Sequence, residues 1–169
     1  QTMLDPADCG PACIALSQDI QGQKFDYPEE FFKERVHTIR RPRPDEFQIK
    51  EAAEKIKSSK NPIIISGGGV FYSDAMEELS QFAIKHNIPV TQTVMGYSTM
   101  KRDHSHFAGQ IGGLGGKNTN TLAKQTDLAI AVGTKLADFT TGSWANFENE
   151  NFKLVSINVS RYDANKHLA

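Results

Sequence analysis

The chain has little cysteine, little net charge and no long apolar run. Two cysteines among 169 residues, Cys9 and Cys13, cannot form the disulfide framework of a secreted protein, so we expect two buried or half-buried thiols in a reducing compartment. The net charge of −1 provides no basic surface for a nucleic-acid partner. No apolar run approaches the ~20 residues of a membrane-spanning helix, so no membrane partner is expected. These absences together favour a cytoplasmic location.

What is present is the composition of a globular protein. Hydrophobic residues make up 38% of the chain and charged residues 23%, which is enough apolar material to bury a core. Short apolar segments alternate with helical patterns after residue 44. The strands expected from these segments are 62–66, 88–93, 106–112, 127–133 and 153–159.

Helices are expected between these strands. Asp45 is a good N-cap for the first, Ser73 or Asp74 for the second, and a third is expected over 118–125. Strands that are apolar on both faces are typical of parallel sheets covered by helices on each side. We therefore predict an α/β fold, a doubly wound, mainly parallel, Rossmann-like sheet of five or six strands in three α/β/α layers, with 63–65 beside 129–131.

The stretch "NPIIISGGGVFYSD" runs an apolar strand into three glycines, as many nucleotide-binding loops do. Gly67 and Gly69 fit the first two glycines of the dinucleotide pattern G-x-G-x-x-G, but Tyr72 stands at the third. The next strand ends in Thr-Gln-Thr, without the acid that would hold a ribose. A nicotinamide dinucleotide is therefore not predicted, whereas a structural turn and another anion at a helix N-terminus both stay open.

Three other patterns are weaker. "GQIGGLGGKN" misses the phosphate-loop pattern, because Ile111 and Asn118 occupy two of its required positions. His104 and His106 could share one face, but no third ligand follows nearby in the sequence. The run "DFTTGSW" after the fourth strand gathers hydroxyl, carboxyl and indole groups in a loop, where function tends to lie.

Several stretches resemble a known family, the thiamine-diphosphate enzymes. "GPACIALSQDIQ" looks like the closing strand of their pyrimidine-binding domain, and "RPRPDEFQIKEAAEKIKSSKNPIIISGGGV", "FAIKHNIPVTQTVMG" and "DLAIAVGTKLADFTTGS" look like their central domain. The resemblance implies that residues 1–21 are that closing strand, 22–44 a linker and 45–169 the central domain of a larger enzyme.

Four segments resemble one branch of this family, the trihydroxycyclohexanedione hydrolases of myo-inositol catabolism. They are "FDYPEEFFKERVHTIRRPRPD", "DFTTGS", "FKLVSINV" and "YDANKHLA". That branch implies cleavage of a carbon–carbon bond in a cyclic 1,2-diketone to give 5-deoxy-glucuronate. Thiamine diphosphate and Mg²⁺ would be bound by the flanking pyrimidine- and diphosphate-binding domains, in a full-length enzyme expected to be a homo-oligomer. No catalytic residue and no metal ligand is expected here, so the 169 residues alone are predicted to be inactive.

The family also suggests where a nucleotide could lie. Some relatives hold FAD or ADP in the central domain, and flavin-binding ones carry G-x-R-x-D-D-R-x-T-G after the fourth strand. Here Lys135 and Phe139 replace the two arginines, so FAD is not expected. A shallow crevice is predicted at seven residues: Gly67, Gly68, Gly69, Met95, Gly112, Gly133 and Asp138. Two outcomes stay open for it: it binds a sulfate, a phosphate or an adenine nucleotide weakly, or it is filled by side chains such as Phe139 and Tyr72 and binds nothing.

Two rival interpretations stay open. One is the central domain of an acetolactate-synthase-like carboligase, against which "DFTTGS" and the missing arginines argue. The other is a stand-alone nucleotide-binding module, against which the apolar stretch 12–17 argues because it lacks a partner strand nearby.

Overall fold

The computed structural model describes residues 2–39 and 41–167 in two compact units, Gln1–Pro42 and Arg43–Ala169. Across the described ranges, no helix is both long enough and apolar enough to cross a bilayer. The last two residues of "YDANKHLA", 168–169, lie outside the described part of the chain.

The first unit contains only two short helical turns, α1 (Gln18–Gln21) and η1 (Glu29–Phe32), and none of its described residues is buried. The strand expected within 10–21 is absent: the chain is extended without strand partners up to Ser17 and then turns into α1. A strand needs neighbours to bond its backbone groups, and the described part of this unit provides none. Cys9 and Cys13 are free thiols, but they are exposed rather than buried, because no core covers them. The assignment of 1–21 to a preceding domain stays a prediction.

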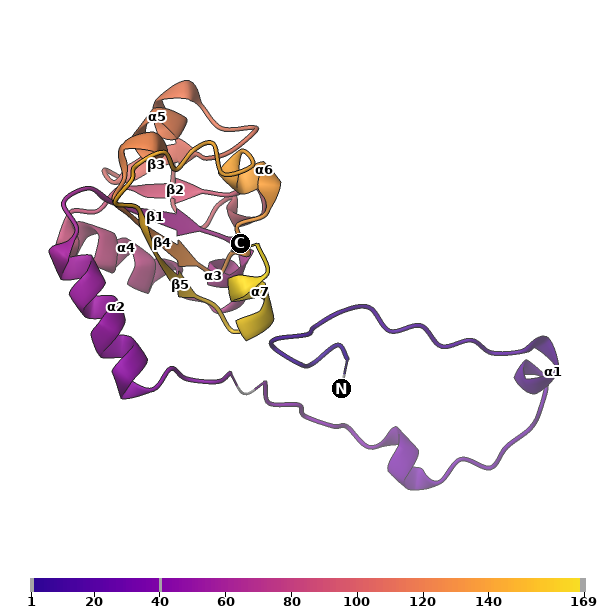
Figure 1. Cartoon of the computed structure of the whole chain (residues 1–169). Coiled ribbons are helices and arrows are strands. Elements are labelled where there is room, and N and C mark those ends of the chain that lie inside the picture. The colour runs from indigo at the N-terminus through magenta and orange to yellow at the C-terminus, as the bar shows by residue number, and fades with distance from the viewer. Residues whose placement is uncertain (1, 40, 168–169) are drawn as a thin grey trace. The chain divides into compact units, whose positions relative to one another are not determined.

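The second unit is built on a five-stranded, all-parallel sheet with the strand order β3-β2-β1-β4-β5 (Figure 1). This confirms the predicted fold class. The strands are β1 (Pro62–Ser66), β2 (Val90–Gln92), β3 (Phe107–Gln110), β4 (Leu128–Val132) and β5 (Lys153–Ile157).

The central strands β1 and β4 pair as expected. Ile63 lies opposite Ala129, and the pairing continues in register to Ser66 opposite Val132. Because β1 also pairs with β2, the strand order reverses beside β1, and in open α/β sheets such a switch point is where ligands tend to bind.

Helices connect the strands. Asp45 caps the first as predicted, since its carboxylate accepts a hydrogen bond from the N–H of Gln48 at 2.8 Å. The remaining predicted caps fail: a short helix already begins at Gly68, and Asp74 has a positive φ of 53° in the turn before the next one. The helices are α2 (Glu46–Ser58), α3 (Gly68–Tyr72), α4 (Met76–His86), η2 (Val94–Gly96), α5 (Lys117–Gln125), α6 (Asp138–Thr141) and α7 (Arg161–Asn165).

Two apolar cores cover the two faces of the sheet. Successive strand residues point to opposite faces, so Ile64 enters one core with α2, α3 and α4, whereas Ile63 and Ile65 enter the other with α5 (Figure 1). The continuous apolar strands predicted from the sequence follow from this double burial.

Ile64 provides a direct test of this packing. It is 0% exposed at the centre of the sheet, so Ile64→Ala should lower the free energy of unfolding by about 3 kcal/mol through lost apolar contact and a residual cavity. The matched control is Ile84→Ala on α4, where the side chain is 55% exposed and the cost should stay below about 1 kcal/mol. Urea unfolding measures both, and equal losses would contradict the core described above.

Candidate functional site

The loops that follow the strands meet at the carboxyl edge of the sheet, where α3, α6 and α7 also lie (Figure 1). They contain all seven residues predicted for a nucleotide crevice. What the structure brings together at this edge is mainly backbone, as the contacts of each glycine show.

The loops after β1 and β4 pack directly on each other. A Cβ added to Gly67 would lie 2.5 Å from Thr134 Cβ, and one added to Gly69 would lie 2.6 Å from Gly133 Cα. Gly133 itself has φ of 60°, a left-handed conformation that favours glycine. These three glycines are therefore required by the close approach of two backbones.

The loop after β2 packs against the start of α3. A Cβ on Gly68 would lie 3.0 Å from the carbonyl oxygen of Met95, and one on Gly96 would lie 2.9 Å from the carbonyl carbon of Ser66. The Met95 side chain is 74% exposed.

The loop after β4 reaches across the sheet edge to the loop after β3. Gly113 donates its N–H to the carbonyl oxygen of Phe139 at 2.8 Å, and Gly112, with φ of 94°, lies against Phe139 and Thr140. Since β1 and β2 stand between β4 and β3 in the sheet, this loop crosses the carboxyl ends of both strands. Leu136 anchors this loop to the domain, because its side chain is buried in the core on the α5 side of the sheet.

Four of the five predicted glycines already donate their N–H groups within the protein. Gly67 donates to Val132, Gly69 to Gly133 and Gly133 to Ile157, at 2.8–2.9 Å, and Gly112 donates to Asn120 Oδ1 at 3.0 Å. An anion would need such amides to be free, and among these five glycines only the N–H of Gly68 has no acceptor in the described part of the chain. The predicted residues therefore do converge, but as a junction of loops whose glycine N–H groups are mostly bonded within the protein.

The flavin-like run after β4 is also engaged differently. Lys135 lies 3.8 Å from Asp163, the acid that follows β5, and Phe139 is 66% exposed. Asp138 is exposed at the first position of α6 and does not cap it with its side chain. Neither of the two residues that replace the arginines, Lys135 and Phe139, therefore contributes to a phosphate-binding site.

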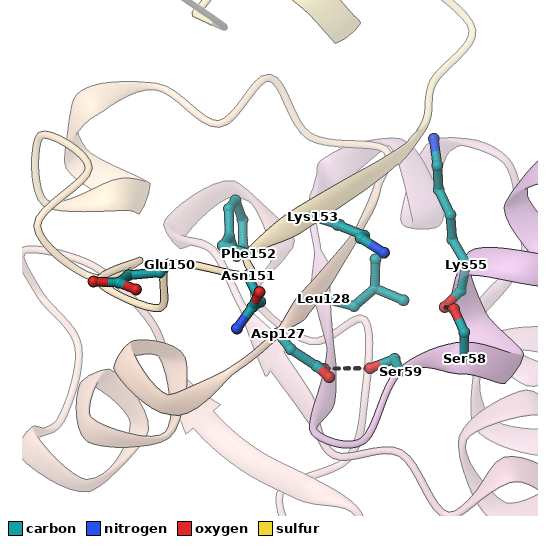
Figure 2. A pocket seen from close by; sticks show the side chains of 9 residues that line it. All are labelled: Lys55, Ser58, Ser59, Asp127, Leu128, Glu150, Asn151, Phe152 and Lys153. Carbon is teal, nitrogen blue, oxygen red and sulfur yellow. Dashed lines mark hydrogen bonds between the residues drawn. The ribbon is translucent and has the colours of Figure 1, made fainter.

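The second unit has two hollows, one at each edge of the sheet. The first, about 320 Å³, opens at the amino edge of the sheet between the end of α2 and the starts of β4 and β5 (Figure 2). The second, about 290 Å³, lies at the ends of β2 and β3 and includes Gln92, Tyr97, Arg102 and Gln110. Neither contains a predicted site residue, and neither was foreseen, because the side chains that line each hollow come from separate segments of the sequence.

Asp127 organises the first hollow. Its carboxylate accepts a hydrogen bond from the Ser59 hydroxyl (Figure 2). It also accepts hydrogen bonds from the Lys60 N–H at 2.8 Å and from the Asn61 N–H at 3.0 Å. Desolvation alone would raise the pKa of Asp127, but the hydrogen bonds from Ser59, Lys60 and Asn61 outweigh it and hold the pKa below the ordinary value of 3.8. The carboxylate thus ties the turn between α2 and β1 to the start of β4.

Arg102 is the cation of the second hollow. Its guanidinium donates a hydrogen bond to the Tyr97 hydroxyl at 2.8 Å, and its carbon lies 5.4 Å from the centre of the same ring. Gln92 is buried beside them, and its amide donates to the Met100 carbonyl at 3.0 Å. The guanidinium of Arg102 is therefore held by contacts with the side chain of Tyr97.

The side chains of His104 and His106 also interact with neighbouring protein groups. His104 Nε2 lies 2.9 Å from the Ser80 hydroxyl, and His104 Nδ1 accepts the N–H of His106. His106 Nε2 lies 3.0 Å from Asn87 Oδ1. Within residues 2–39 and 41–167, no group of three or more His, Cys, Asp or Glu side chains is close enough to hold a metal ion. With the N–H groups of four of the five predicted glycines also bonded within the protein, these residues do not fit a magnesium-diphosphate group.

The glycine junction can be tested by adding one methyl group. Gly67→Ala should lower the free energy of unfolding by about 2 kcal/mol or more, because the new Cβ would meet the backbone of Gly133 and Thr134, which cannot move aside cheaply. Gly113→Ala is the control, since its nearest neighbour would be the Phe139 ring at 3.6 Å, an ordinary contact, and its cost should stay within about 0.5 kcal/mol. A Gly67 variant as stable as the control would show that the loops do not pack as described.

Asp127 gives a pH-dependent prediction. Asp127→Asn should cost about 2 kcal/mol at pH 7, because the charged acceptor of three hydrogen bonds is lost. A carboxyl with a lowered folded pKa stabilises the protein above its ordinary value of 3.8, and this stabilisation is lost as the pH falls below it. The gap between wild type and Asp127→Asn should therefore be constant from pH 7 to 5 and narrow below pH 4.

Urea midpoints across this range measure that gap, with exposed Asp103→Asn as the control. A gap that widens on acidification, or one equal to that of the control, would contradict the anchoring role of Asp127.

Three comparisons place the chain among known proteins. The family model described as "Thiamine pyrophosphate enzyme, central domain" matches residues 49–169. The chain is 47% identical over 166 residues to a 3D-(3,5/4)-trihydroxycyclohexane-1,2-dione hydrolase of Clostridium botulinum (strain Eklund 17B / Type B), and 43% identical over 166 residues to such a hydrolase of Bacillus thuringiensis (strain Al Hakam). Each match covers 98% of this chain and 26% of the relative, so the chain spans about a quarter of the length of these relatives.

A solved structure agrees on the fold. The benzoylformate decarboxylase of Polynucleobacter necessarius superposes with a TM-score of 0.62 at 22% identity, over 80% of this chain and 25% of that one. At this identity the likeness concerns the architecture alone. The matched family model covers most of the chain, and the five parallel strands have the fold of that neighbour; the chain belongs to the thiamine pyrophosphate enzymes, as a central domain of that family.

Proposed function

We propose that the whole protein to which this chain belongs is a thiamine-diphosphate-dependent hydrolase that cleaves a carbon–carbon bond of 3D-(3,5/4)-trihydroxycyclohexane-1,2-dione to give 5-deoxy-glucuronate in inositol catabolism. One observation carries the proposal: the 47% identity to a relative of that name extends over 98% of this chain. It includes both the first unit and the central domain, so the likeness is not limited to a common fold.

In this proposal the chain itself performs no chemical step. Thiamine diphosphate and Mg²⁺ would be held by domains outside these residues, which agrees with the poor fit of the present side chains to such a group. The proposed organisation is the closing strand of a preceding domain over 1–21, a linker over 22–44 and the central domain over 45–169. We expect the intact enzyme to be a cytoplasmic homo-oligomer.

The seven residues at the carboxyl edge would then serve packing more than binding. Their glycines hold adjacent loops at backbone contact distance, and all of these glycines except Gly68 donate their N–H groups to protein acceptors. Any adenine nucleotide or phosphate held there would bind weakly, and FAD is not expected, because Lys135 and Phe139 cannot supply the planar contacts of arginine.

The proposed activity is tested on the full-length protein. With thiamine diphosphate and Mg²⁺, it should consume the cyclic dione and release one molecule of 5-deoxy-glucuronate for each ring opened, as followed by chromatography with mass detection. The same preparation should not form acetolactate from pyruvate, the reaction expected of the rival carboligase. The 169-residue chain, assayed in parallel, should neither turn over the dione nor bind the cofactor in calorimetry.

Two outcomes would contradict the proposal. Acetolactate formation without ring opening would favour the carboligase, and magnesium-dependent micromolar binding of thiamine diphosphate by the 169 residues alone would place the cofactor site within them.

A further inference from the structure

The carboxyl edge carries an exposed apolar surface. Six large side chains form what we call the edge patch, and all are contributed by loops or short helices that follow strands β1 to β4. They are Phe71, Tyr72, Met95, Tyr97, Leu114 and Phe139.

Contacts among the loops hold the patch together. Met95 Cβ lies 3.7 Å from the position that a Cβ of Gly68 would take, so the methionine stands beside α3 with its two aromatic rings. At the other end, the Phe139 ring lies 3.6 Å from the Cβ position of Gly113, next to Leu114. The loop that crosses the ends of β1 and β2 joins these two halves.

The chemistry of the patch fits a protein better than a small anion. Four of the five predicted glycines beneath it have bonded N–H groups, and of the six patch side chains only Tyr97 lines one of the two hollows described above. Phe, Tyr and Met are the side chains enriched in the buried centres of protein interfaces. Contiguous apolar surface of this kind is unusual on a protein that no partner covers.

The size of the relatives identifies the partner. About three quarters of each relative's length lies outside the region that this chain matches, and the matched family model describes a central domain. We propose that the edge patch is the surface on which a flanking domain of the same polypeptide docks. This goes beyond the proposed function, because it holds whichever reaction the whole protein catalyses.

Hydroxyl-radical footprinting of the intact protein tests the docking without a mutation. The rate of oxidation of each side chain is measured in the folded protein and again in the same protein unfolded in urea. An uncovered side chain with the exposures of Met95, Leu114 and Phe139, 74%, 64% and 66%, should react less than about twofold more slowly when folded. Docking should slow all three by about tenfold or more, as for the buried centre of an interface.

Ile84 on α4 is the internal control, because it is 55% exposed and lies outside the patch. If Met95, Leu114 and Phe139 react no more slowly than expected from their exposure, the proposal is wrong. Protection that appears only after ADP is added would assign the edge to a nucleotide and overturn the proposal as well.

Photo-crosslinking identifies the occupant. Phe139→benzoylphenylalanine, and separately Met95→benzoylphenylalanine, is introduced into intact protein prepared as a mixture of ¹⁴N and ¹⁵N copies. Crosslinks within one copy to residues outside this chain are expected. Crosslinks found only between ¹⁴N and ¹⁵N copies would identify a second copy instead and contradict docking within one polypeptide. Because neither measurement uses the dione, failure of the proposed activity and failure of the docking are distinguishable.

Discussion

The backbone contact between the loops after β1 and β4 is the constraint on which the rest of the carboxyl edge depends. Gly67, Gly69 and Gly133 bring two main chains so close that no side chain fits between them, and the N–H of Gly69 bonds the carbonyl of Gly133 at 2.9 Å. This contact lies at the switch point of the sheet, between β1 and β4, which pair in register from Pro62 to Ser66. It also sets the direction in which the chain leaves β4, and so allows the following loop to cross the ends of β1 and β2.

The same constraint explains why a glycine-rich turn need not be a phosphate site. Glycines are used where the chain approaches another group closely, and that group can be a ligand or another loop. The acceptors of the N–H groups distinguish the two cases. Here Val132, Gly133 and Ile157 accept the N–H groups of Gly67, Gly69 and Gly133, so only the N–H of Gly68 in the run 67–69 is left for a phosphate. The missing arginines and these bonded amides are two independent features that argue against a flavin.

Sequence reasoning predicted the sheet well, because burial on both faces leaves a local signal. Ile63, Ile64 and Ile65 must all be apolar in a central parallel strand, and the same holds for 128–131. The convergence of the loops was also predicted, since it follows from parallel strand direction. That these glycines pack against another loop rather than a ligand was not predicted. It depends on contacts between residues some 65 positions apart, such as Gly69 and Gly133. The break between α3 and α4 at Asp74, the hollow at Asp127 and the exposure of both thiols likewise depend on long-range packing, or on its lack, which leaves no mark in a short window.

The amino and carboxyl edges of the sheet satisfy their polar groups in different ways. At the amino edge, polar groups at the turn between α2 and β1 would be left without partners, and Asp127 satisfies three of them with one carboxylate. At the carboxyl edge, contacts between the loops themselves satisfy most of the glycine N–H groups. Apolar side chains such as Phe139 and Met95 gain little on a surface that stays in water, where each leaves most of its area solvated. Their presence at this edge is therefore best explained by a covering surface from outside residues 43–169, and about three quarters of the length of the relatives lies outside the region that this chain matches.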